Sequence, residues 1–148
     1  MSLVEWEKYG WLTAHRTSAR EIGDLLAVVE RDLADSAAGQ VSADWRLSIA
    51  YNAALQAATT ALAASGYRAS RDQHHYRVIH SLRETINADE LMVTTFDVFR
   101  KKRNISGYER AGVASDSDAT AMRKLALAIR DQVVAWMKTN HPDLLSCR

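Results

Sequence analysis

Apolar residues recur at three- and four-residue steps along most of this chain, which is the period of an amphipathic α-helix. The first long stretch with this pattern covers residues 17–37, and Ser18 with Glu21 predicts a capping box at its start. Its apolar stripe consists of Ile22, Leu25, Leu26, Val29 and Leu33. The preceding stretch, residues 3–14, is either a short separate helix or an extra turn joined through Gly10.

The second long helix is predicted to begin after Ser42, a good N-cap, and to run to about Ser65. Gly66 is placed to end it in a left-handed conformation. Alanine dominates the middle of this helix, so neighbouring backbones can approach it closely. The pattern favours either the central helix of a bundle or a contact between subunits. The alanines are Ala50, Ala53, Ala54, Ala57, Ala58, Ala61, Ala63 and Ala64.

Two further helices are predicted in the middle of the chain. One covers about residues 74–86, and the next runs from residue 88 to roughly Arg103, with Asn87 and Glu90 as its capping residues. Their apolar sides consist, in order, of Val78, Ile79, Leu82 and Ile86, and of Leu91, Met92, Phe96, Val98 and Phe99.

The last helix is predicted to begin after Ser115 or Ser117 and to end before Pro142. Its stripe is Met122, Leu125, Ala126, Ile129, Val133 and Trp136. No stretch alternates apolar and polar residues in the manner of a strand. The sequence therefore predicts an all-α fold, an antiparallel bundle of four to five helices in a single domain over residues 1–148, with a leading segment at 1–16 and a flexible tail at 140–148.

Composition narrows the class of protein. A chain of 148 residues can bury a core of its own, and its 19 Lys and Arg nearly balance its 18 Asp and Glu. Binding to nucleic acid would therefore need a local basic patch. The only cysteine is Cys147, which excludes an internal disulfide and fits a reducing compartment, so we expect a cytoplasmic protein. No stretch is apolar enough to predict export or membrane insertion.

The basic patch is the run of four cations from Arg100 to Arg103, inside the sequence RKKRNISGY. One interpretation is a solvated last helical turn whose cations interact with the negative end of the helix dipole. The other is a phosphate or nucleotide site in which Arg103 is a bidentate ligand, doubled across a symmetric dimer. Asn104 is either a helix cap or a further ligand.

His74, His75 and His80 raise the possibility of a metal site. No pair of them has the i, i+4 spacing with which two imidazoles grip one ion, so structural roles are favoured and no metal is expected. One of the three could still supply a base if its helix packs beside Tyr108. No phosphate-binding or dinucleotide glycine motif is present, so no cofactor is expected either.

The four tryptophans are interpreted in two pairs. Trp45 and Trp136 fall on apolar stripes and are predicted core anchors. Trp6 and Trp11 lie on the leading segment, where they could close a subunit interface.

Three stretches together resemble the HEPN superfamily of helical bundles, which contains RNases, toxins and non-catalytic members. They are SGYR at 65–68, DQHHYRVIHSL at 72–82 and KRNISGYE at 102–109. The resemblance implies that Arg103 is the motif arginine, Asn104 the polar residue after it, and Tyr108 the position of the motif histidine. It also implies a homodimer whose two motifs meet in a cleft.

Tyrosine at position 108 departs from the family pattern. Activation of a ribose hydroxyl needs a group that exchanges a proton near neutral pH, and the pKa of tyrosine, about 10, suits this poorly. We therefore expect a dimeric binding module for a nucleotide, RNA or a protein, with Arg100, Arg103, Asn104 and Tyr108 as ligand-binding residues. The resemblance implies a nucleotidyltransferase-type antitoxin as a partner. The alternative is an active RNase toxin that uses Arg103 with a substituted base.

Overall fold

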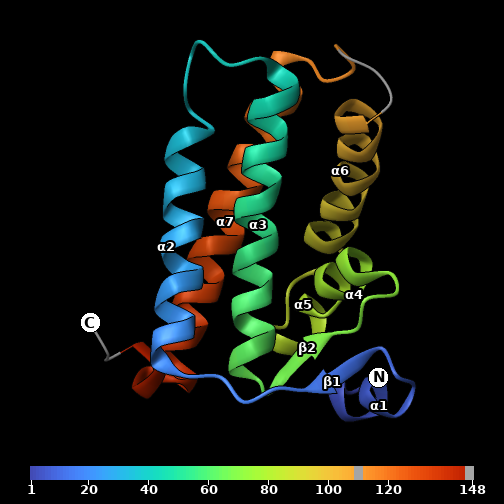
Figure 1. Ribbon diagram of the computed structural model, residues 1–148, viewed down its shortest axis with the longest axis vertical. Coiled ribbons are helices and arrows are strands. Elements are labelled where there is room, and N and C mark those ends of the chain that lie inside the picture. Colours follow the sequence, from blue (N-terminus) through green and yellow to red (C-terminus); the bar gives the residue numbers. More distant parts are fainter. Residues whose placement is uncertain (109–111, 146–148) are drawn as a thin grey trace.

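The computed structural model describes the backbone of residues 1–108 and 112–145, and the side chains of these residues except 105–108. Figure 1 shows a mostly helical molecule, as predicted. The long helices are α2 (Ala19–Asp35), α3 (Ala43–Ala64), α6 (Glu90–Tyr108) and α7 (Asp116–Asn140). The short elements are α1 (Leu3–Lys8), β1 (Leu12–Ala14), β2 (Tyr67–Ala69), α4 (His74–His80), α5 (Leu82–Thr85) and the 3-10 helix η1 (Pro142–Leu145).

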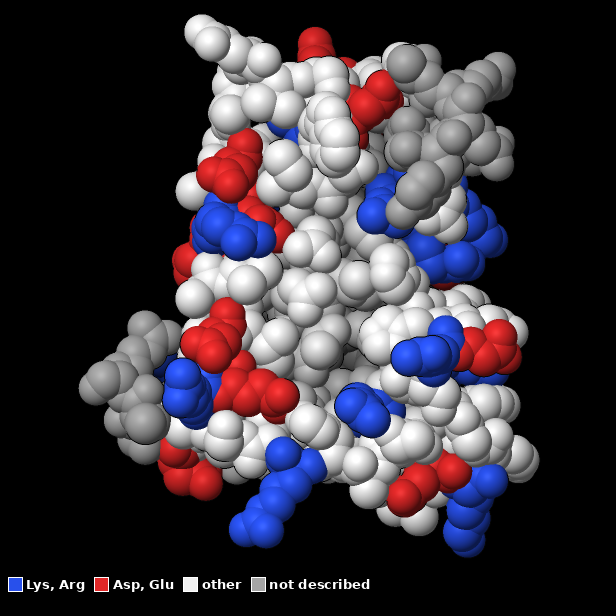
Figure 2. Space-filling model, viewed as in Figure 1, with Lys and Arg blue, Asp and Glu red and all other residues white. Residues whose placement is uncertain are grey.

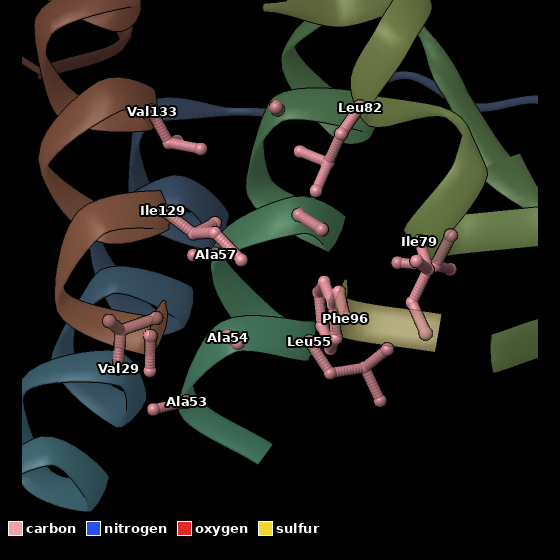
Figure 3. Packing of buried hydrophobic residues seen from close by; sticks show 14 of the residues in the cluster. Val29, Ala53, Ala54, Leu55, Ala57, Ile79, Leu82, Phe96, Ile129 and Val133 are labelled. Atoms are coloured by element: carbon pink, nitrogen blue, oxygen red, sulfur yellow. The ribbon is translucent and has the colours of Figure 1, made fainter. Parts of the chain in front are cut away.

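Helix α3 is the centre of the core. In Figure 3, Ala57 lies beside Ile129 of α7, while Leu55 points to the opposite side, toward Phe96 of α6 and Ile79 of α4. The small side chains of α3 let α2 and α7 pack closely against it. Of the two predicted roles for the alanine-rich helix, the structure shows the central one. Its fully buried alanines are Ala50, Ala53, Ala54, Ala57, Ala58 and Ala61.

The starts of the helices follow the capping residues in the sequence. The Ser42 side chain accepts a hydrogen bond from the Trp45 amide, and Gly66 has the predicted left-handed φ of 96°. Ser18 caps α2 in the same way, but Glu21 does not complete the expected capping box. Its carboxylate instead accepts hydrogen bonds from the Thr17 hydroxyl and the His15 ring, at 2.6 and 2.7 Å.

The last helix, α7, begins at the first of the two predicted caps. The Ser115 side chain accepts from the Asp118 amide, and the Asp118 carboxylate accepts from the Ser115 amide, which completes a capping box. Asp44, in the first turn of α3, accepts hydrogen bonds from the amides of Gly112 and Ala114 just before this cap. The start of α7 is therefore fastened to the start of α3.

Helix α6 differs from the prediction at both ends. Its N-cap is Asp89, whose carboxylate accepts from the Met92 amide at 2.9 Å, whereas Asn87 adopts a left-handed φ of 55° before the helix. The helix also continues past Arg103 to Tyr108. The basic run is therefore internal to the helix and does not form its last turn.

The apolar side of α6 also differs from the prediction. Val93 and Phe96 are buried, but Leu91 and Val98 are 74% and 61% exposed. Residues seven apart share one side of a helix, and the side of Leu91 and Val98 faces away from α3. Trp45 is likewise 66% exposed on α3 and is not the core anchor that its position predicted.

A small antiparallel sheet was not predicted from the sequence. Strands β1 and β2 pair Leu12 with Ala69, Thr13 with Arg68 and Ala14 with Tyr67. Three residues are too few for an alternating pattern to be recognised. Because of this sheet, the leading segment 1–16 packs on the rest of the chain.

Trp6 belongs to the core of this amino-terminal segment. Its side chain is 6% exposed, and its ring meets the Trp11 ring edge-on at 5.7 Å. Trp6 is therefore buried within the chain and is not placed to close a subunit interface.

The carboxyl-terminal segment continues beyond α7. Within the predicted tail, η1 packs against α2 and α7. Residues 146–148, which include Cys147, lie outside the described part of the chain. No helix in the described part combines the length and the apolar character needed to cross a membrane.

Candidate functional site

Successive cations of the basic run point to different sides of α6, because neighbouring residues turn by about 100° around a helix, whereas Arg100 and Arg103, three residues apart, share one side. Arg100 donates from Nε to the Asp97 carboxylate at 2.7 Å, and the Lys101 ammonium lies 3.7 Å from the same carboxylate. The Lys102 ammonium lies 2.8 Å from Asp118 of α7. In Figure 2 a group of Lys and Arg side chains lies over the region of α6. Since the helix continues past them, the helix dipole, which acts within the last turn, does not explain the run.

Arg103 lies against a buried tyrosine of the central helix. The Arg103 Cζ atom is 5.5 Å from the centroid of the Tyr51 ring, whose side chain is only 1% exposed. The Tyr51 ring also meets Phe96 of α6 edge-on at 5.5 Å. The Tyr51 hydroxyl is 3.0 Å from Nδ1 of His75 on α4. Arg103 and His75, from different helices, therefore converge on one phenol ring.

The surroundings of His75 favour its neutral form. Burial lowers the pKa of His75, and the positive charge of Arg103 lowers it further. Burial raises the pKa of Tyr51, and the charges of Arg103 and Arg100 offset only part of this effect. Near neutral pH the site therefore holds a guanidinium, a neutral imidazole that can accept a proton, and an un-ionised phenol.

A second group of polar residues lies beside this site, at the junction of α4, α5 and α6. Arg83 donates to Nδ1 of His80 at 2.8 Å, and Nε2 of His80 is 3.7 Å from Asp97. Because arginine only donates, His80 in this arrangement carries its proton on Nε2, toward Asp97. Burial lowers the pKa of His80, and the charge of Arg83 acts in the same direction. Burial alone would raise the pKa of Asp97, but the Arg100 hydrogen bond and charge outweigh it and leave that pKa lowered.

The remaining candidates from the sequence are Asn104, Tyr108 and His74. Asn104 is exposed on α6, inside the helix, so it is not the C-cap that was considered. Tyr108 is the last residue of α6, and its side chain lies outside the described part of the structure. A joint role for Arg103 and Tyr108 therefore stays a prediction. His74 is exposed, with Nδ1 3.2 Å from the Ser70 carbonyl oxygen. No three His, Cys, Asp or Glu side chains among the described residues are grouped as metal ligands.

Sequence reasoning missed two members of the site. Tyr51 is the one aromatic residue in the alanine-rich stretch of α3, and a buried hydroxyl needs a hydrogen-bond partner. Asp97 precedes Arg100 and Lys101 by three and four residues, the spacing of helical ion pairs. Both signals are present in the sequence, but neither identifies His75 as the partner of Tyr51.

Comparison with known proteins adds no relative to this picture. No protein-family model matches the chain, and neither the curated proteins nor the solved structures contain a significant match.

Proposed function

We propose that this chain is a HEPN-like bundle that binds the phosphate groups of a nucleotide or of RNA at Arg103 and Arg100, without cleaving RNA. The observation that carries the proposal is the placement of Arg103 over Tyr51 and beside His75. The cation–π contact with a buried ring of the central helix holds the guanidinium beside α3, and a guanidinium fork matches the oxygens of a phosphate.

The positive charges of Arg100 and Arg103 act together around Tyr51 and His75. Arg100 and Arg103 are three residues apart and share one side of α6. The positive charges of both affect the pKa values of Tyr51 and His75, so their fields overlap at this point. Asp97 neutralises part of the charge of Arg100. In this proposal Arg103, which contacts the Tyr51 ring, is the principal phosphate ligand, and Arg100 is the secondary one.

The proposal is tested by replacing Arg103 with alanine and measuring the binding of a fluorescent single-stranded RNA by anisotropy over a range of salt concentrations. We expect weaker binding and a salt dependence reduced by about 0.7 in log–log slope, the value for one phosphate contact on a single strand. Arg20→Ala, which removes an exposed cation of α2, is the matched control and should change the affinity little. Unchanged affinity and slope in Arg103→Ala would refute the proposal.

The sequence resemblance extends the proposal to a homodimer, and to a nucleotidyltransferase-type antitoxin as its partner. Sedimentation equilibrium of the purified chain tests the first of these statements. A concentration-independent monomer mass would remove the two-fold cleft from the proposal.

A second candidate function, metal-independent RNA cleavage, is favoured by one specific observation. His75 contacts the hydroxyl of the tyrosine whose ring contacts Arg103, and burial and the charge of Arg103 lower its pKa, so it could take the place of the missing motif histidine as a base. Cleavage of RNA in the presence of a chelator, lost in His75→Ala and in Arg103→Ala but kept in His74→Ala, would establish this function. Growth arrest on expression that Arg103→Ala abolishes would be its cellular counterpart.

A further inference from the structure

A series of contacts between rings and guanidinium groups, called the stack below, leads from the amino-terminal segment to Arg100 of α6. The Tyr9 and Trp11 rings are stacked, with centroids 4.9 Å apart and planes at 26°. The Arg77 guanidinium lies 3.8 Å above the Trp11 ring and 5.4 Å from the Tyr76 ring. Arg100 lies 5.6 Å from the same Tyr76 ring. The stack therefore ends at a residue of the candidate phosphate site.

The outer end of the stack is held in place by hydrogen bonds. Gly10, with a φ of 79°, turns the chain between Tyr9 and Trp11. The Ser70 hydroxyl donates to the Gly10 carbonyl oxygen at 2.6 Å, and the Ser70 amide donates to the Trp11 carbonyl oxygen at 2.9 Å. These contacts tie the turn to the segment between β2 and α4. The rings are therefore arranged before any ligand binds, which lowers the entropic cost of binding.

The stack is open to solvent where it begins. Tyr9 is 60% exposed, and Trp11, Tyr76 and Arg77 are each half-buried. The contacts of Arg77 with Trp11 and Tyr76, and of Arg100 with Tyr76, do not involve Tyr9. The exposed Tyr9 ring packs only on the Trp11 ring in this series of contacts. An exposed ring next to guanidinium groups is the arrangement with which proteins bind unpaired nucleobases and their phosphates.

We propose that Tyr9, Trp11 and Arg77 form a base-stacking subsite that continues the phosphate site of Arg100 and Arg103. The proposal rests on the function proposed above and names its ligand class: an unpaired stretch of RNA, longer than one nucleotide, whose bases stack at Tyr9. A cationic protein segment would also be attracted to an exposed tyrosine ring, but Arg77 and Arg100 would repel it. A duplex is excluded as ligand because its bases are already stacked and paired.

The test compares three ligands: a single-stranded RNA of about 10 nucleotides, within the range bound by aromatic single-strand sites, its duplex, and uridine monophosphate. We expect Tyr9→Ala to weaken single-strand binding about fivefold or more, the lower range for loss of one stacked base, and to leave the binding of uridine monophosphate unchanged. Tyr9→Phe should bind the single strand as the natural chain does. The matched control is Trp45→Ala, which removes an exposed ring on α3 that belongs to none of these contacts, and it should have no effect.

The possible results separate this inference from the function on which it rests. If Arg103→Ala weakens single-strand binding and Tyr9→Ala does not, the subsite is refuted and the phosphate site stands. If Tyr9→Ala weakens duplex and single strand equally, or no more than Trp45→Ala, base stacking at Tyr9 is likewise refuted. If neither RNA nor uridine monophosphate binds the natural chain, both proposals fail. Thermal melting of each variant confirms that the fold is intact.

Discussion

Replacement of Ala57 by leucine tests how tightly the central helix is packed. Ala57 is fully buried on α3 and lies beside Ile129 of α7 in Figure 3. Leucine adds three carbon atoms at this point. If there were room, their burial would stabilise the protein by roughly 0.8 kcal/mol per carbon. Because the neighbouring helices already meet the alanine surface, the added atoms must displace α7 or adopt a strained rotamer, which costs about 1 to 3 kcal/mol.

The assay is urea unfolding followed by circular dichroism, with thermal melting as a second measurement. We expect a lower midpoint with an unchanged slope, and a melting temperature lower by about 2–12 °C, from about 2–4 °C per kcal/mol for a chain near this size. The matched control is Ala121→Leu on the exposed side of α7, which should change the free energy of unfolding by at most about 0.5 kcal/mol. If Ala57→Leu is as neutral as this control, α3 is not the tightly packed centre described above.

The remaining predictions concern the polar site. Tyr51→Phe removes the hydroxyl that contacts His75 and should lower the free energy of unfolding by about 0.5–1.5 kcal/mol, measured in urea; no change would mean that the hydrogen bond contributes nothing. Arg103→Met should raise the pKa of His75 in an NMR titration, because a nearby positive charge is lost; an unmoved titration would place the guanidinium elsewhere. The pKa values of His75 and His80 are lowered by folding, so the unfolded chain binds protons first on acidification, and stability should fall as the pH drops through about 6.5 toward the folded-state pKa values; urea midpoints that rise over this range would contradict the assignment. Asp97→Asn frees the guanidinium beside it and should tighten RNA binding, whereas weaker binding would show that this carboxylate supports the site by positioning it.

Features that depend only on residues close together in the sequence, such as the ends of helices, could be predicted. Ser42 and Gly66 mark the ends of α3 because a cap acts on the amides and carbonyls next to it. The exposed side of α6 could not be predicted, because Leu91 and Val98 are apolar and nothing local shows which side of a helix meets the core. The two short strands depend on a pairing between distant segments, which a three-residue pattern does not encode.

The candidate site likewise has one part that local sequence predicts and another that depends on contacts between distant segments. Arg103 was predicted because it belongs to a local run of cations and to a motif. Its contact with Tyr51, and the contact of Tyr51 with His75, join three helices that are far apart in the sequence. Only the packing of α4 and α6 against α3 creates these contacts. A single sequence therefore suggests the cation of this site and three candidate imidazoles, but not which imidazole lies there or that Tyr51 contacts it.

Because the charge of Arg103 affects the pKa of His75, the binding of an anion at Arg103 is coupled to the protonation of His75. An anion that settles on the guanidinium cancels part of the positive charge that holds the imidazole neutral, so the affinity of His75 for a proton rises on binding. Because such coupling is reciprocal, acidification strengthens anion binding by the same factor. Calorimetric titrations in buffers of different ionisation enthalpy would register this as net proton uptake, which makes His75 a built-in reporter of occupancy at Arg103.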